Sequence, residues 1–356
     1  MYLPCKTKIK EMKKQKINIF AIPGAAATPI AALIFLTAGL SLSTALPGQD
    51  TEEFKPGGKP EVRIFTSAGT VVSGGMSHTS FDLGRAYLGY NFNFSGNLSG
   101  RIVYDVADQA VGNFKFTGLL KFAYLQYQTG RFTINGGMIP IPEYGYAEKR
   151  WGYRYIYKPS HDIYGFGGSS DLGISITGRI SSWISADVTL ANGEGFKLKE
   201  ADSTLIASAG VTLKPVRNIS LRGYFDNMTK DGISQQTFEF LASFETEIAG
   251  VTASYHYRRN DDITDGLNYQ GFSVNGRVAV NEKISVIGRY DYTTSVTLVN
   301  EDTPWNLSDD GQFFLAAVNF SLTPGVSMAP NIQIWKPASS EMPCIYRFLL
   351  SLDLKI

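Results

Sequence analysis

The sequence predicts an all-β protein, a 16-stranded antiparallel transmembrane β-barrel, and three observations support this. Runs of alternating apolar and polar residues recur along the chain, short and long connections alternate between them, and the last run reaches the final residue. The composition agrees, because the 356 residues include 22 Phe, 19 Tyr and 36 Gly but only 18% charged residues. Many strands separated by tight turns would have this composition, and a mean hydropathy of −0.07 argues against several membrane-spanning helices.

The alternating runs define the expected strands. In the run 237–245, Phe238 and Phe240 lie on one face of the expected strand, and Glu239 and Glu245 lie on the other. Most runs reach the 9–11 residues, roughly, that a tilted strand needs to cross a bilayer. The alternative is a soluble β-sandwich, whose strands are shorter. The sixteen runs are 61–69, 81–94, 98–107, 118–128, 131–139, 170–180, 183–192, 203–214, 218–227, 236–246, 249–259, 268–280, 283–293, 311–322, 325–335 and 346–356.

The connections alternate between two or three residues and longer polar stretches, the longest being 140–169. Tight turns at one end of the sheet and variable loops at the other are typical of an outer-membrane barrel. In lipid every backbone group must be paired, so such a sheet has to close. We therefore expect 346–356 to pair with the first strand. This segment also looks like a C-terminal signal for the outer-membrane insertion machinery, although it ends on Ile356 rather than on an aromatic residue.

The N-terminus differs from the rest of the chain. Six lysines precede the apolar run 25–45, and Ser43 and Ala45 suit a cleavage site, so we expect a signal peptide over 1–45. A retained membrane anchor is the alternative, and the start codon is either Met1 or Met12. Residues 46–60 are then a short periplasmic segment and 61–356 the barrel. Cleavage changes 33 basic and 32 acidic residues to 27 and 31, a net charge of −4, which argues against nucleic-acid binding.

Several stretches resemble the phosphate-selective porins of the O/P type. They are "SFDLGRAYLGYNFNFSGNLSGRIVYDV" (80–106), "LLKFAYLQY" (119–127), "FTINGGMIPIP" (132–142), "KRWGYRYIYK" (149–158) and "YGFGGSSDLGIS" (164–175). The resemblance implies sixteen strands, a homotrimer in the outer membrane of a Gram-negative bacterium, and a long third loop folded into the lumen. The loop 140–169 is third in order and longest, which agrees with that architecture. Outer-membrane lipid and lipopolysaccharide, and the barrel-assembly machinery, are the expected partners.

The polar face of the runs is expected to line the lumen, because an arginine in the middle of the lipid face costs about 2–4 kcal/mol. These charges are either anion sites or partners of one another across the wall. The expected lumenal cations are Arg63, Arg85, Arg101, Arg179, Arg222, Arg258, Arg277 and Arg289. The expected lumenal acids are Asp105, Asp187, Asp226, Glu239, Glu245 and Asp291.

The third loop is the expected pore constriction, with Lys149, Arg150, Arg154 and Lys158 as its cations and Tyr153 and Tyr155 beside them. A ring of basic side chains at a constriction attracts anions and repels cations, so we expect a weak anion preference. The alternative is that these residues only fasten the loop to the wall. Lysines are scarce in the runs, which argues against true phosphate selectivity.

Two functions fit these features: a porin for passive diffusion of small hydrophilic solutes, or a non-conducting barrel that acts as an adhesin or surface scaffold. The three histidines, His78, His161 and His256, form no catalytic or metal-binding spacing with Ser, Asp or Cys. We therefore expect no enzymatic activity, no cofactor and no metal. The solute that passes and the path of the loop 140–169 cannot be deduced from these patterns.

Overall fold

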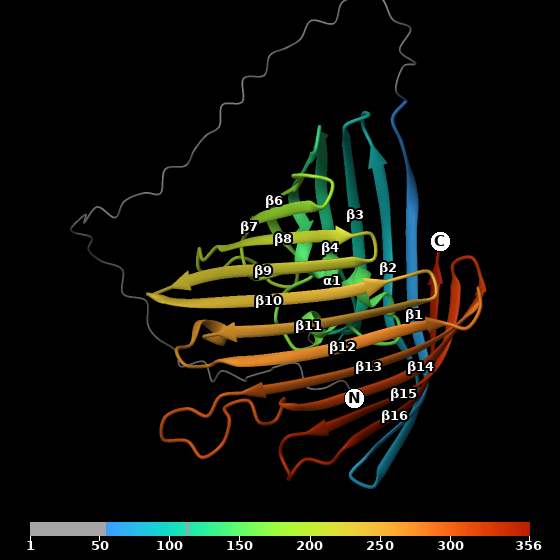
Figure 1. Cartoon of the computed structure of the whole chain (residues 1–356), viewed down its shortest axis with the longest axis vertical. Helices are drawn as coiled ribbons and strands as arrows, with labels where there is room; N and C mark the ends of the chain where they lie inside the picture. The colour runs from blue at the N-terminus through green and yellow to red at the C-terminus, as the bar shows by residue number, and fades with distance from the viewer. Residues whose placement is uncertain (1–54, 112–113) are drawn as a thin grey trace, which may run out of the picture. The chain divides into compact units, whose positions relative to one another are not determined.

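The computed structural model describes residues 55–111 and 114–356, without the side chains of 108–115. The expected signal peptide, 1–45, lies outside the described residues. The described part folds into sixteen antiparallel strands that form one closed barrel (Figure 1). The strands are β1 (Gly57–Ser73), β2 (Met76–Asn93), β3 (Leu98–Val111), β4 (Phe114–Thr129), β5 (Phe132–Pro140), β6 (Ser170–Arg179), β7 (Ile184–Ala191), β8 (Ile206–Val216), β9 (Ile219–Lys230), β10 (Ile233–Glu245), β11 (Ala249–Arg259), β12 (Tyr269–Ala279), β13 (Ile284–Ser295), β14 (Gly311–Thr323), β15 (Val326–Pro337) and β16 (Ile345–Lys355).

The first and last strands close the barrel, as the final alternating run predicted. β1 pairs with β16 from Arg63 opposite Lys355 to Ser73 opposite Ile345. The ladder continues to the chain end, where the amide of Ile356 donates to the carbonyl of Val62 at 2.9 Å. On the inner face the guanidinium of Arg63 holds both carboxylate oxygens of Asp353 at 3.0 and 2.9 Å. The closed sheet of described strands therefore has no unpaired edge strand.

The strands have the predicted sidedness, with apolar side chains outward and polar side chains inward. In β10, Phe240 and Phe244 are 59% and 44% exposed, whereas Glu239 and Ser243, on the opposite face, are buried. The same alternation holds in β6, where Ile174 is exposed and Ser175 is fully buried. A continuous apolar outer face on a closed barrel suits lipid on the outside.

The expected strict alternation of short and long connections is wrong at three places. β1 and β2 are joined only by Gly74 and Gly75, and β9 and β10 only by Asp231 and Gly232. All four residues have positive φ, as a two-residue type I′ hairpin turn requires. The third place lies between β3 and β4, where Val111 pairs with Phe114. The polar residues that suggested loops belong instead to strands that continue to these turns.

The run 118–128 does not keep a single alternating phase, because β4 contains a β-bulge. Val103 pairs with Phe122, but the next residue, Tyr104, pairs with Leu120. Lys121 is therefore the extra residue, and the outward positions change from even to odd numbers beyond it. A single alternating phase cannot describe this strand.

The described connections contain three short helices. They are α1 (Pro142–Trp151) and α2 (Ser160–Ile163) between β5 and β6, and the 3₁₀ helix η1 (Asp261–Ile263) between β11 and β12. No helix in the described part of the chain is both long and apolar enough to span a membrane.

An arginine introduced on the outer face should destabilise the barrel more than one introduced on the inner face. Ile174→Arg would place a charge among exposed apolar side chains of β6, at a cost of about 2–4 kcal/mol near the middle of the bilayer. Thr177→Arg, in the same strand but on the inner face opposite Asp187, is the matched control. Urea unfolding in phospholipid vesicles, followed by tryptophan fluorescence, measures both. Equal losses would contradict the assigned sidedness.

Candidate functional site

The candidate site is the interior of the barrel, where residues 141–169 connect β5 to β6 and carry α1 and α2. The local sequence explains α1: Pro142 suits the first helical position, and Gly152 ends the helix at φ 74°. Glu143 in the first turn and Lys149 and Arg150 in the last turn complement the helix dipole. The alternation that identified the strands carries no information about such a helix.

The helix α1 packs against the inner face of β9 and β10. The guanidinium Nε of Arg222 donates to the carboxylate of Glu143 at 2.5 Å, and the hydroxyls of Tyr146 and Ser220 lie 2.7 Å apart. One turn further on, Arg150 is paired with Glu245. Each wall residue of these contacts lies on a strand face that points away from the apolar outside.

The segment between α1 and α2 contacts other strands around the ring. Tyr155 donates its hydroxyl proton to Asn319 of β14 at 2.6 Å, and the side-chain amide of Gln333 in β15 donates to the carbonyl of Ile156 at 3.2 Å. The Nε of Arg154 donates to the hydroxyl of Tyr87 in β2 at 3.3 Å. Because β2 and β9 lie on different sides of the ring, the segment crosses the interior.

Several predicted wall residues face inward but are sealed by this segment. Arg222 binds Asp187 as well as Glu143, with the Asp187 oxygen at 2.7 Å. Arg258 donates to the carbonyls of Gly165 and Phe166, and Arg289 donates to the carbonyl of Lys158. The buried members of the predicted wall, all at most 8% exposed, are Arg222, Arg258, Arg289, Asp105, Asp187, Asp226, Glu239 and Asp291. They contact protein rather than an open aqueous space. The three arginines, Glu239 and Asp291 hold the loop to the wall. Asp105 and Asp226 instead bind wall residues, Arg85 and Tyr224.

The remaining predicted wall residues are at least partly open to water. Arg101 binds Glu61, and each of these side chains is 27% exposed. Arg85 is half-buried beside Asp105, and Arg277 is half-buried and donates to the carbonyl of Thr246 at 3.2 Å. Arg179, at the end of β6, is exposed.

The six residues of the predicted constriction divide in the same way. Arg154 and Tyr155 are buried, and Arg154 pairs with Asp162 at 3.0 Å. Lys158, which lies 3.8 Å from the same carboxylate, is one-third exposed. Lys149, in the last turn of α1, is exposed and has no ion-pair partner within the described residues.

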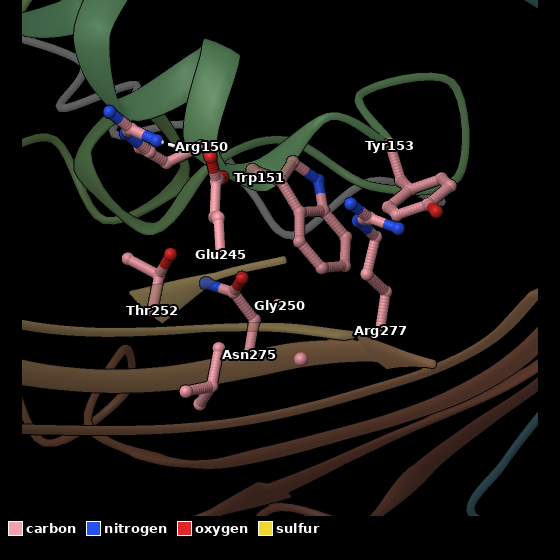
Figure 2. Close-up of a pocket in the computed structure, with 10 residues that line it drawn as sticks. Arg150, Trp151, Tyr153, Glu245, Gly250, Thr252, Asn275 and Arg277 are labelled. Carbon is pink, nitrogen blue, oxygen red and sulfur yellow. Dashed lines mark hydrogen bonds and ion pairs between the residues drawn. The ribbon is translucent and has the colours of Figure 1, made fainter. Parts of the chain in front are cut away.

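A small cavity separates the loop from β10 to β12. Arg150 and Glu245 meet on one side of it, and Tyr153 lies near Arg277 on the other, with Trp151 between them (Figure 2). The cavity measures about 20 Å³, which is room for a single water molecule. The two remaining constriction residues, Arg150 and Tyr153, therefore lie in a narrow gap against the wall.

Lys121 is an interior cation that the sequence analysis missed because the bulge hid its direction. It is buried, with its ammonium 3.8 Å from Asp105. The rings of Tyr87, Phe196 and Tyr144 lie within 5.1, 5.3 and 5.6 Å of that ammonium. Such rings attract a cation through their faces, which compensates part of its burial.

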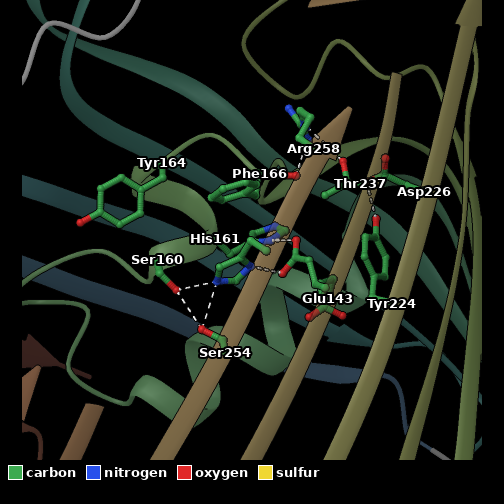
Figure 3. A network of polar contacts seen from close by, with 12 residues as sticks. Glu143, Ser160, His161, Tyr164, Phe166, Tyr224, Asp226, Thr237, Ser254 and Arg258 are labelled. Atoms are coloured by element: carbon green, nitrogen blue, oxygen red, sulfur yellow. Dashed lines mark hydrogen bonds and ion pairs between the residues drawn. The ribbon is translucent and has the colours of Figure 1, made fainter. Parts of the chain in front are cut away.

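Two histidines share one carboxylate where α2 meets the wall, a cluster that no sequence spacing indicated. The Nδ1 of His161 lies 2.5 Å from one oxygen of Glu239, and the Nδ1 of His256 lies 2.8 Å from the other (Figure 3). The Nε2 of His256 lies 3.0 Å from the hydroxyl oxygens of both Ser160 and Ser254. Ser160, His256 and Glu239 thus follow the atom order of a catalytic triad. Through Ser160 and His161, these contacts fasten α2 to β10 and β11.

Burial and neighbouring charges shift the titration of two loop residues at this contact. Burial, together with the carboxylate of Glu239, raises the pKa of Glu143 to about 7, although Arg222 opposes the shift. Burial acts to lower the pKa of His161, but the Glu239 carboxylate outweighs it, so the pKa of His161 is raised. Both shifts follow from bringing ionisable loop side chains into a closed interior.

Solved structures of outer-membrane proteins share this architecture, whereas no protein-family model and no curated protein sequence matches the chain. The outer membrane channel DcaP of Acinetobacter baumannii is 11% identical, with a TM-score of 0.64 over 87% of this chain and 100% of that one. Pseudomonas putida OprB is 11% identical, with a TM-score of 0.65 over 84% and 94% of the two chains. An anion-selective porin from Comamonas acidovorans is 11% identical, with a TM-score of 0.62 over 85% and 100%. At this identity the likeness establishes the fold, and a relation to the O/P type stays a prediction.

Removing the guanidinium of Arg222 should destabilise the protein strongly. Arg222→Met leaves Glu143 and Asp187 as buried carboxylates without their partner, which costs about 3–5 kcal/mol. Arg101→Met breaks a partly exposed pair of the same chemistry and should cost about 1 kcal/mol or less. Urea unfolding measures the free energies, and trypsin cleavage after Lys149 or Arg150 reports whether the loop has left the wall. Similar losses in the two variants would contradict the distinction between sealed and open pairs.

Proposed function

We propose that the protein is an outer-membrane channel for passive diffusion of small hydrophilic solutes, with a weak preference for anions. The observation that carries the proposal is the sidedness of the closed barrel, apolar outside and polar inside. A barrel of this kind crosses a bilayer and encloses a polar interior. The solved structures with a similar fold include an outer membrane channel and an anion-selective porin, which agrees with this function.

Water-accessible charges support a path along the part of the wall that the loop leaves free. Arg101 and Glu61 of this wall are partly exposed, and so are Lys158 and Glu148 of the loop. Lys149 adds an exposed cation on α1. The path runs between the free side of the loop and the strands β1 to β3.

The proposed anion preference rests on Lys149, which is exposed and has no ion-pair partner among the described residues. Arg101 is neutralised by Glu61, and Arg150 is neutralised by Glu245. Lys158 and Arg154 share Asp162, and Arg154 also lies 3.9 Å from Glu148. These two cations and two carboxylates balance, so Lys149 supplies the excess positive charge. A small excess of positive charge at a narrow point attracts anions by Coulomb focusing. Phosphate selectivity needs a denser cluster of cations than these positions supply.

The proposal includes the cellular context that the sequence indicated. The chain would be exported with its signal peptide 1–45 and inserted through its C-terminal strand by the assembly machinery. It would then act as a homotrimer among outer-membrane lipid and lipopolysaccharide. The apolar outer face and the strand that ends at the C-terminus support this context.

A non-conducting barrel that presents surface loops is the second candidate. The observation that favours it is the extent to which residues 141–169 fill the interior, with Arg154, Arg222, Arg258 and Arg289 all buried. A barrel plugged in this way would carry no current. Conductance measurements decide between the two candidates.

The folded protein should form steady ohmic channels in planar lipid bilayers, and Lys149 should lie on their water path. In a Cys344→Ser background, Lys149→Cys should react with a charged methanethiosulfonate reagent added to the aqueous phase, and the conductance should fall. The Cys344→Ser protein alone is the control and should not respond. Absence of channels from protein shown to be folded would favour the non-conducting barrel.

Neutralising single charges along the path should shift the ion preference in directions set by their sign. Lys149→Gln and Arg101→Gln each remove a positive charge, so the reversal potential in a KCl gradient should move toward cations. Glu61→Gln should move it toward anions. Lys283→Gln changes the same charge in the turn between β12 and β13 and is the control. A shift in the same direction for Arg101→Gln and Glu61→Gln would contradict the proposed path.

A further inference from the structure

The cluster of His161, Glu239 and His256 brings together donor atoms that a metal ion could share. His161 belongs to α2 in the loop, Glu239 to β10 and His256 to β11. All three are buried, with at most 1% exposure, and one ligand atom from each lies within 4.8 Å of the others. Their separation in the sequence explains why no metal-binding motif was visible.

We propose that His161, Glu239 and His256 bind a divalent transition-metal ion of the zinc, cobalt or nickel class, and that the ion links the third loop to the barrel wall. Two imidazoles and one carboxylate are a common donor set for such ions. This site is independent of the proposed diffusion function, because it concerns the attachment of the loop and not the solute path.

The distances allow such an ion after a small displacement. The two Nδ1 atoms lie 2.5 and 2.8 Å from the carboxylate oxygens of Glu239. Metal bonds of about 2.0–2.1 Å in a tetrahedral arrangement place neighbouring donors roughly 3.3 Å apart. The two nitrogen–oxygen distances must therefore lengthen by under about 1 Å. The ligand atoms of the two imidazoles, which lie within 4.8 Å of one another, must approach each other. His161 can supply it, because it lies on a four-residue helix outside the sheet.

The hydrogen-bond partners of His256 favour coordination through its Nδ1. On binding, the proton of each Nδ1 would be replaced by the ion and each neutral ring would carry its proton on Nε2. For His256, the hydroxyls of Ser160 and Ser254 are already 3.0 Å from Nε2 and can accept that proton. Such outer partners orient metal-binding histidines.

The surroundings of His161 leave one side for an ion to approach. Its Nε2 is buried without a partner among the described residues. That side of the ring is closed by Gly167, where an added Cβ would lie 2.3 Å from Nε2. The Nδ1 side, in contrast, faces Glu239 and His256.

A further carboxylate near the cluster favours a cation. Glu143 lies beside it (Figure 3), and one of its carboxylate oxygens is buried without a hydrogen-bond partner. A dication between the loop and the wall would offset the repulsion between the carboxylates of Glu143 and Glu239.

Direct metal binding by the folded protein tests the proposal. The purified barrel in detergent is stripped with EDTA, dialysed, and titrated with Co²⁺ and then Zn²⁺. We expect one ion per chain, a visible Co²⁺ absorption spectrum of a tetrahedral site, and its displacement by Zn²⁺. A folded wild-type protein that binds no ion overturns the proposal, whatever its conductance.

Variants locate the site. His161→Ala and Glu239→Gln should each weaken binding by more than about 100-fold, and the double variant Ser160→Ala with Ser254→Ala by about 10–100-fold. His78→Ala removes the exposed histidine of β2 and should leave the affinity unchanged. If Glu239→Gln does not fold, His161→Ala carries the test, because His161 lies outside the sheet. Unchanged affinity in His161→Ala, or a loss in His78→Ala, would assign the ion to another place and overturn the proposal.

Discussion

The pairing of β1 with β16 is the constraint on which the rest of the structure depends. A sheet whose outer face is apolar cannot leave amides or carbonyls unpaired in lipid, where an unsatisfied group costs several kcal/mol. The ladder therefore continues to the last residue, with Ile356 and Val62 bonded to each other. Once the sheet is closed, the alternation of side chains assigns every second residue to the interior. The chemistry of that interior follows from closure.

A closed ring of sixteen strands encloses more space than its own side chains fill, and the third loop occupies part of it. The loop brings backbone carbonyls and ionisable side chains into a buried space, where each needs a partner. The wall supplies these partners, for example Arg258 for the carbonyls of Gly165 and Phe166, and Asn319 for Tyr155. Many inward-facing charges are thus explained by the loop and not by a solute. A count of lumenal arginines alone therefore overstates the charge that a permeating ion would meet.

The sequence was informative about features that depend only on the alternation of side chains within one strand. Alternation located sixteen strands, their sidedness and their closure, because lipid on one face imposes a period of two on every strand. It missed the tight turns at Gly74–Gly75 and Asp231–Gly232, because polar residues that flank them, such as Ser77, His78 and Thr79, interrupt the apolar alternation. It also missed the inward direction of Lys121, because one extra residue in β4 reverses the phase. The family resemblance suggested the loop, but no local pattern shows which wall residue each loop residue meets.

The same limit explains why the interior contacts could not be deduced. Glu239 follows His161 by 78 residues and precedes His256 by 17 residues. Glu239 and His256 lie on neighbouring strands, whose register fixes the distance between them. In β10 and β11, Glu239 lies directly opposite His256, so the wall half of the cluster is set by the sheet itself. Only the loop half, His161, depends on how residues 141–169 fold. The wall therefore presents a preformed imidazole–carboxylate pair, and α2 completes it with a second imidazole. Because one half is rigid and the other lies on a short helix, a ligand that bridges the two halves would act on the position of the loop and leave the barrel unchanged.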